Sequence, residues 1–261
     1  MKITTNLEWN DLVLDANTAS QVEKIRVWIW IVNKATLEEE SHLKRFIKPG
    51  YRVFFYGASG TGKKLVAMLS GKAANLPVYS LDLSLMASKY TGETEKNIAA
   101  IFEKATKDKA IFFFNEADAL FGKRTQTSSN NDRHANQEIA YILQCIEDFN
   151  GLVILASNSK YNLDEAFARR FQAMVHFPMP NSNERLKLWN TIFSNTYKLN
   201  DIISVVNIAE RYELSGGNIV NILQQVSILK EKGKAQEISK AMVMQAIRDE
   251  FIKKGKSILV N

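Results

Sequence analysis

The chain has 261 residues, of which 46% are hydrophobic and 24% are charged, and this balance excludes a disordered chain. A single cysteine, Cys145, excludes a disulfide framework and a cysteine-based zinc site. The net charge is +6 with basic and acidic residues interspersed, and the longest apolar run, 27–32, is far shorter than the ~20 residues of a membrane span.

Apolar runs alternate with helical patterns over the first two thirds of the chain. The run 27–32 is expected to be a buried helix turn or a strand. Continuous apolar strands that alternate with helices are typical of a parallel sheet covered on both faces. The expected strands are 53–56, 78–81, 111–114, 152–155 and a strand-like run at 173–177, and helices are expected from about Lys63, from Thr94 and over 135–149.

Beyond Pro180 the strand patterns stop and only helical periodicity remains. The sequence therefore predicts an α/β core over 1–180, with 1–50 leading into it, and a small all-helical lid domain over 181–261. A polar, turn-rich stretch at 126–132 is expected to be a mobile loop. The helices expected in the second part are 183–193, 203–212, 217–230 and 238–253.

A phosphate loop is predicted where the first strand meets the helix after it. Residues 57–63 read Gly-Ala-Ser-Gly-Thr-Gly-Lys. Glycines let successive N–H groups point at a phosphate, the helix N-terminus adds partial positive charge, and the lysine supplies a full charge for ATP or ADP. The alternative is a glycine-rich turn without a ligand. The residues expected to contact nucleotide are Gly57, Ser59, Gly60, Thr61, Gly62, Lys63, Lys64 and Leu65.

The residues that would hold Mg²⁺ depart from the usual pattern at two positions. Lys64 stands where a Ser or Thr hydroxyl would bind the metal, and Asn115 stands where an acid would hold it. Glu116 remains as the candidate base that polarises the attacking water, the alternative being a solvated loop carboxylate. We hypothesise that the Lys64 ammonium partly replaces Mg²⁺. The alternative to this hypothesis is that a water-filled Mg²⁺ site survives, with Asn115 as a weak position in a degenerate metal site.

These motifs, together with others along the chain, resemble the AAA+ ATPases, in particular the branch that includes spastin and katanin. The resemblance extends from about Trp9 to Gly255. A narrower resemblance is to the AAA+ ATPases that accompany bacterial contractile injection systems. It depends on stretches 81–84, 117–124 and 132–138, of which the last two occur in similar form across the wider family.

The resemblance implies catalytic and adenine-binding positions. Asn158 matches sensor 1, an amide that can position the lytic water, with a structural asparagine cap as the alternative. Arg169 and Arg170 match the arginine fingers, which reach the ATP of the neighbouring subunit; the alternative is a surface pair that balances nearby acids. Leu12 and Val13 match the segment whose backbone lines the adenine pocket.

The resemblance also implies a substrate pore and a lid contact. Lys89, Tyr90 and Gly92 match the first pore loop, in which an aromatic residue grips an extended polypeptide, whereas an ordinary half-buried tyrosine is the alternative. The second pore loop falls at about 122–133. Gly217 lies in the sensor 2 region of the lid, where this branch carries a small residue.

The expected function is that of an ATP-driven ring, a homo-oligomer and by resemblance a hexamer, that remodels or threads protein substrates in the cytoplasm. Recruitment of the substrate would fall to another protein or to a further part of a longer chain. Because Lys64 and Asn115 weaken the metal site, the main alternative is a nucleotide-binding assembly scaffold with little or no hydrolysis. A third possibility is a loader linked to nucleic acid. Neither a membrane nor nucleic acid is expected as a direct partner.

Overall fold

The computed structural model describes residues 1–33, 50–82, 93–120, 130–158, 168–194, 204–234 and 237–255. The chain divides into two compact units. The first consists of Met1–Leu7, Ala16–Gly57 and Lys63–Phe177, and the second of Glu8–Asp15, Ala58–Gly62 and Pro178–Asn261.

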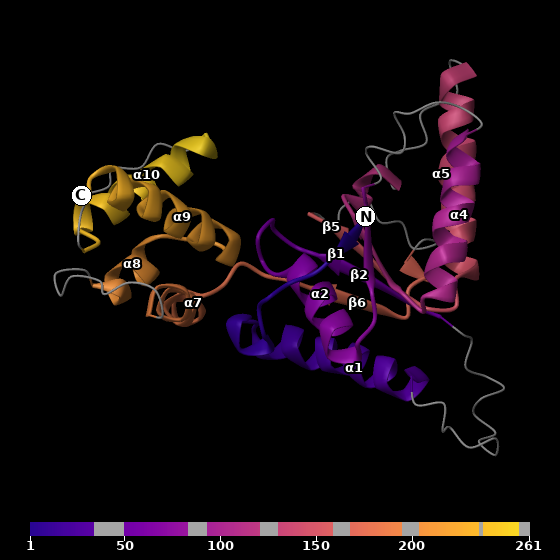
Figure 1. The fold of residues 1–261 in the computed structure, drawn as a ribbon, viewed down its shortest axis with the longest axis horizontal. Helices are drawn as coiled ribbons and strands as arrows, with labels where there is room; N and C mark the ends of the chain where they lie inside the picture. The colour runs from indigo at the N-terminus through magenta and orange to yellow at the C-terminus, as the bar shows by residue number, and fades with distance from the viewer. Residues whose placement is uncertain are drawn as a thin grey trace. The chain divides into compact units, whose positions relative to one another are not determined.

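The first unit is built around a six-stranded sheet in the order β1-β3-β4-β5-β2-β6 (Figure 1). All neighbouring strands are parallel except β1, which pairs antiparallel with β3 at one edge. The predicted α/β fold is confirmed, and β1 is an addition that the sequence did not predict. The strands are β1 (Lys2–Ile3), β2 (Tyr51–Tyr56), β3 (Val78–Asp82), β4 (Ile111–Asn115), β5 (Leu152–Ser157) and β6 (Ala173–His176).

Helices cover both faces of this sheet (Figure 1). Helices α1 (Ala16–Asn33) and α2 (Lys63–Ala74) lie together on one face, where α2 packs on β3, β4 and β5. Helices α4 (Glu93–Lys107) and α5 (Asn130–Asp148) pair on the other face and pack against side chains of β2, β4 and β5. Because successive strand residues point to opposite faces, the apolar runs of β4 and β5 supply both layers of core.

Two local expectations need correction. The run 27–32 is helical, as part of α1, but it is only partly buried: Ile29 is 4% exposed, whereas Trp30 is 58% exposed. This follows from helical periodicity, which directs some side chains of any run away from the sheet. In the polar stretch 126–132, residues 126–129 lie outside the described residues, while α5 begins at Asn130, so its last residues are helical.

The helical part of the second unit contains α7 (Ser182–Ser194), α8 (Val205–Arg211), α9 (Gly216–Lys232) and α10 (Lys240–Lys253). Trp189 and Phe193 of α7 pack with Ile219 and Ile222 of α9 in a separate apolar core. Ser204, Ser215 and Ser239 cap the N-termini of α8, α9 and α10, each accepting a bond from a backbone N–H of the first turn. None of the helices described is long and apolar enough to cross a membrane.

Candidate nucleotide site

The loop between β2 and α2 has the backbone that the phosphate-loop prediction requires. Gly57, Gly60 and Gly62 have φ angles of 139°, 78° and 105°, which disfavour residues with a side chain. At Gly57 a Cβ atom would lie 2.0 Å from the carbonyl oxygen of Phe177, so a side chain cannot be placed there. Helix α2 begins at Lys63, and the first N–H groups of a helix have no partner inside it. N–H groups at such a position can donate to a bound anion.

The tip of this loop, residues 58–62, belongs to the second unit. The Gly217 N–H donates to the Gly60 carbonyl oxygen at 2.9 Å. A Cβ atom at Gly62 would lie 2.9 Å from Leu12 Cδ1, so Leu12 lies against the loop. Val13 packs against the apolar core of the helices. The second unit thus brings the predicted adenine segment, the loop tip and the lid glycine together.

Lys63 is a buried cation at the start of α2. Its side chain is 8% exposed, and Nζ donates to the carbonyl oxygen of Gly57 at 2.5 Å. Burial lowers the pKa of the ammonium from 10.5 to about 8, and the charge of Asp118 acts in the opposite direction. An ammonium held in this way, at the start of a helix, can neutralise phosphate charge.

The carboxyl ends of β4 and β5 hold two of the predicted catalytic residues, Glu116 and Asn158. Asn115 is the last residue of β4, and the exposed Glu116 follows it with φ at 54°, in the left-handed region that few residues with a side chain adopt. The fully buried Ala117 anchors the turn. Asn158, directly after β5, is exposed, and its backbone N–H donates to Asp118 Oδ2 at 3.4 Å.

Asp118 is a residue of this site that the sequence did not single out. It lies in the short 3-10 helix Ala117–Leu120, and its Oδ1 atom accepts a hydrogen bond from the hydroxyl of Ser157. Ser157 is 1% exposed, so this bond satisfies a buried donor. The available signal was position alone: Asp118 is two residues after Glu116 in the acidic motif.

The donor set at the predicted metal position does not fit Mg²⁺ in the usual way. Lys64 presents an exposed ammonium where an oxygen ligand would be needed, and Asn115 presents a half-buried neutral amide. Mg²⁺ prefers oxygen ligands with carboxylate charge in octahedral geometry. Among the described residues no group of acidic, His or Cys side chains is arranged to hold a metal ion. Within the described part of this motif, Glu116 has an exposed carboxylate, whereas the carboxylate of Asp118 accepts hydrogen bonds from Ser157 and Asn158.

The two predicted arginine fingers differ in their surroundings. Arg170 Nη1 lies 2.5 Å from Glu147 Oε1, and both side chains are partly exposed. Arg169 is exposed and forms no ion pair with any residue in the described ranges. Arg169 is therefore the arginine that is available to another molecule.

The remaining predicted positions lie on the loop and α2 or fall outside the described residues. Ser59 is exposed on the loop, Thr61 Oγ1 donates to the Ala58 carbonyl oxygen at 2.8 Å, and Leu65 is half-buried in α2. The first pore loop, with Lys89, Tyr90 and Gly92, lies outside the described residues. Of the second pore loop, residues up to 129 also lie outside them.

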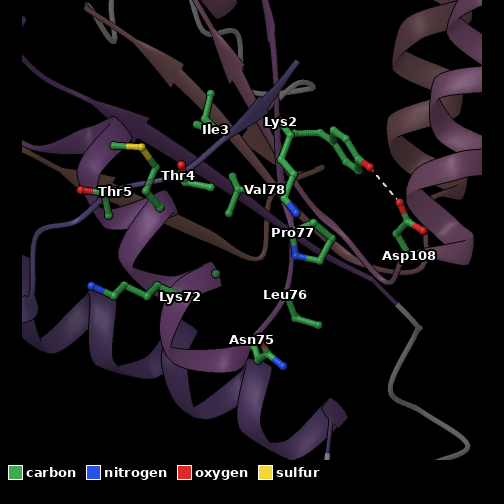
Figure 2. A pocket seen from close by; sticks show the side chains of 13 residues that line it. Lys2, Ile3, Thr4, Thr5, Lys72, Asn75, Leu76, Pro77, Val78 and Asp108 are labelled. Carbon is green, nitrogen blue, oxygen red and sulfur yellow. Dashed lines mark hydrogen bonds between the residues drawn. The ribbon is translucent and has the colours of Figure 1, made fainter.

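A cavity of about 620 Å³ lies elsewhere on the first unit (Figure 2). It is lined by β1, by the end of α2 and by the turn into β3, including Lys2, Lys72 and Pro77. Asp108 accepts a hydrogen bond from Tyr79 Oη at 2.7 Å at its edge. None of the predicted nucleotide-site residues lines this cavity, so it is separate from the chemistry described above.

Comparison with known proteins agrees with this arrangement of motifs. Residues 53–179 match the model of the ATPase family associated with various cellular activities (AAA). Vacuolar protein sorting-associated protein 4A of Homo sapiens is 29% identical over 193 residues, which cover 72% of this chain and 44% of that protein. Fidgetin-like protein 1 of Drosophila melanogaster is 29% identical over 185 residues, covering 69% of this chain and 35% of that protein.

A third relative is the protein SUPPRESSOR OF K(+) TRANSPORT GROWTH DEFECT 1 of Arabidopsis thaliana. It is 31% identical over 153 residues, which cover 57% of this chain and 35% of that protein. These proteins lie in the branch with spastin and katanin, so the predicted resemblance is confirmed at that level. The chain spans less than half the length of these relatives. The narrower resemblance to ATPases of injection systems stays a prediction.

Proposed function

Because residues 53–179 match the model of the AAA ATPase family, we propose that this chain binds ATP through its phosphate loop and works as an ATP-driven ring on protein substrates. The observation that carries the proposal is the loop itself. Its glycines, at φ angles that favour glycine, lie directly before a buried lysine that opens a helix. That combination supplies amide donors and one strong charge for a triphosphate.

The proposed chemistry assigns a role to each described residue. Lys63 would transfer its bond from the Gly57 carbonyl to phosphate oxygens, and Glu116 would accept the proton of the attacking water. Arg169 would reach the nucleotide of an adjoining subunit and stabilise the developing charge there. Leu12 and Gly217 would contact the nucleotide from the segments that already lie against the loop tip.

Binding is tested by titrating ATP into the purified chain by calorimetry. We expect affinity in the micromolar range for wild type and a loss of at least about 30-fold for Lys63→Met, because one charged hydrogen bond to phosphate contributes roughly 2 kcal/mol or more. Lys72→Met, at the other end of α2, is the matched control and should bind like wild type. No binding by wild type at millimolar ATP would refute the proposal.

The metal hypothesis is tested by the same titration with EDTA. If the Lys64 ammonium takes over part of the work of Mg²⁺, affinity should change by less than about threefold on chelation. Lys64→Thr should then make binding depend on Mg²⁺, because a hydroxyl donor returns and the cation is lost. Loss of wild-type binding in EDTA would show that an ordinary metal site is needed.

The alternative function is a nucleotide-binding scaffold with little or no turnover, and the donor set at Lys64 and Asn115 is the observation in its favour. Steady-state phosphate release distinguishes the two functions. The variant Glu116→Gln, which lacks the proposed base, serves as the blank that gives the background release. Release above this blank supports an ATPase. Release equal to the blank, together with nucleotide-dependent assembly, supports a scaffold.

Restoring the metal ligands tests whether the rest of the pocket is competent. The double variant Lys64→Thr with Asn115→Asp should raise Mg²⁺-dependent phosphate release by about tenfold or more, because a hydroxyl and a carboxylate would then be in place to hold Mg²⁺, which would supply positive charge to the triphosphate. Each single variant is the control for the other. No gain in the double variant would mean that further groups of the site are unsuited to hydrolysis.

A further inference from the structure

A buried carboxyl group lies between the last two helices of the second unit. Glu250 of α10 is 2% exposed, and its Oε1 atom accepts hydrogen bonds from the side-chain amides of Asn218 at 2.7 Å and Asn221 at 3.2 Å. Both asparagines belong to α9, which packs along α10 (Figure 1). The buried Oε2 atom accepts no bond from the described residues. Because a buried carboxyl group is costly unless it is bonded, the two amides are what hold Glu250 in place.

The amide of Asn218 connects Glu250 to the start of α9. Its nitrogen donates to Glu250, and its oxygen accepts from the backbone N–H of Ser215 at 3.0 Å and from the Ser215 hydroxyl at 2.8 Å. Lys254 Nζ donates to the same oxygen at 2.6 Å. An amide that is bonded at both ends cannot turn over without losing bonds. Glu250 therefore fixes which end of Asn218 faces the helix cap.

The capped turn is the part of α9 that contacts the phosphate loop. The Gly217 N–H donates to the Gly60 carbonyl oxygen at 2.9 Å, and a Cβ atom on Gly60 would lie 2.5 Å from Ser215 Oγ. The loop tip, α9 and α10 all belong to the second unit, so these hydrogen bonds run through one compact body. The position of the loop tip thus depends on the bonds at the start of α9.

We propose that Glu250 is a positioning residue of the nucleotide site, which holds Asn218 so that the first turn of α9 keeps its bond to the phosphate loop. The inference rests on the proposed function, since it concerns how the same loop is held ready for ATP. Glu250 is assigned no contact with nucleotide. Its effect reaches the nucleotide through Asn218, through the cap of α9 and through the loop tip.

Exchange of the two functional groups tests this contact directly. Asn218→Asp keeps an oxygen for the cap but removes the amide donor, so two carboxyl groups face each other and repel when both are ionised. The Kd for ATP, measured by calorimetry, should rise about threefold to tenfold, the range that corresponds to one lost hydrogen bond. An acid at the third position of a helix otherwise favours the helix N-terminus, so this weakening would depend on Glu250.

The second half of the exchange should restore the contact. Glu250→Gln alone keeps an oxygen that can accept from both asparagines, so the Kd should change by less than about threefold. In the double variant Asn218→Asp with Glu250→Gln, the amide and the carboxylate have changed places and can bond again, so the Kd should return to within about threefold of wild type. If the two positions do not interact, Glu250→Gln changes the Kd by the same factor in both backgrounds, and the inference is overturned.

A matched control separates this contact from overall charge. Asp249→Asn, placed in the Asn218→Asp background, removes a negative charge from the neighbouring exposed position of α10 and should leave binding weak. Equal recovery with Asp249→Asn and with Glu250→Gln would mean that net charge acts and not the contact, which overturns the inference. If Asn218→Asp does not fold, Glu250→Leu removes the acceptor instead and should raise the Kd by a similar factor.

Hydrogen exchange in the nucleotide-free protein follows the turn itself. Backbone amides of residues 215–219, measured by mass spectrometry, should exchange about threefold faster or more in Asn218→Asp and return to the wild-type rate in the double variant. This measurement involves no nucleotide, so the charge of ATP cannot affect it. Unchanged exchange in Asn218→Asp would show that Glu250 does not hold the turn.

The outcomes distinguish this inference from the proposed function. If wild type binds no ATP, the proposed function fails and this inference with it, whatever the exchange rates. If wild type binds and the double variant stays as weak as Asn218→Asp, the inference alone is overturned. Recovery of both the Kd and the exchange rate with Glu250→Gln, but not with Asp249→Asn, supports it.

Discussion

Lys63 is the residue at which binding and stability have opposite requirements. Its ammonium is buried, with Nζ bonded to the Gly57 carbonyl oxygen, and burial lowers its pKa to about 8. A lysine whose pKa falls on folding binds its proton less tightly in the folded chain than in the unfolded chain. The phosphate loop is thus charged at neutral pH, at a cost to the stability of the nucleotide-free protein.

Lys63→Met should therefore stabilise the nucleotide-free protein at pH 7, by about 1–3 kcal/mol, because methionine fills the space without a buried charge. Between pH 8 and 10.5 the unfolded chain holds more protons at this position than the folded chain, so wild-type stability gains on the variant as pH rises. Urea unfolding at pH 7 and pH 9.5 measures the difference. A gap that widens with pH would contradict the argument, and Lys72→Met serves as the control.

Gly57→Ala should be among the most damaging single changes in the loop. Its φ is 139°, and a Cβ atom would lie 2.0 Å from the Phe177 carbonyl oxygen, which belongs to backbone and cannot rotate away. We expect a loss of roughly 3 kcal/mol or more of unfolding free energy, measured in urea. Gly216→Ala is the comparison, since its Cβ meets only atoms at 3.5 Å and beyond. Equal stability of the two variants would be inconsistent with the loop geometry.

At the level of elements, the serine caps of α9 and α10 form a matched pair. Ser215 and Ser239 each accept from a backbone N–H of the first turn, so replacement by alanine should cost about 1 kcal/mol in either case. Ser215 alone adjoins the phosphate loop, where a Cβ atom at Gly60 would lie 2.5 Å from its Oγ.

Ser215→Ala should consequently weaken ATP binding by about threefold to tenfold, whereas Ser239→Ala should leave the Kd unchanged. Thermal unfolding establishes that the two variants lose similar stability, and calorimetric titration then compares their affinities. The same Kd for both would mean that the cap of α9 does not influence the loop, even though the two are in contact.

The elements differ in how far the sequence predicted them, for physical reasons. The central strands and the helices from α7 onward could be predicted from hydrophobic periodicity. A buried strand is a continuous apolar run, and a helix that packs on one side has one apolar stripe, so each leaves a pattern in the local sequence. Strand β1 has two residues and is defined by its partner β3, so no local pattern indicates it. The hydrogen bond from Gly217 to Gly60 and the hydrogen bond from Ser157 to Asp118 each join residues distant in sequence, and motif spacing alone does not predict such contacts.

For the whole molecule, variants of Arg169 and Arg170 can test whether one subunit acts on the nucleotide of another. Arg170 is engaged by Glu147 within the chain, whereas Arg169 is exposed. An arginine that acts on a neighbouring subunit must remain available until the ring forms. We therefore expect Arg169→Ala to abolish phosphate release in the assembled protein. Arg170→Ala should have a smaller effect, because this substitution removes only the ion pair with Glu147.

Mixing two inactive variants shows whether Arg169 acts between subunits. Glu116→Gln lacks the proposed base and Arg169→Ala lacks the proposed arginine finger, so neither variant should release phosphate alone. In rings assembled from equal amounts of both, about a quarter of the interfaces join an intact Glu116 to an intact Arg169 of the adjoining subunit. Phosphate release should then recover to about a quarter of wild type, with sedimentation confirming mixed rings. A mixture that assembles yet stays inactive would mean that Arg169 serves its own subunit or none, since two defects in one and the same site cannot complement each other.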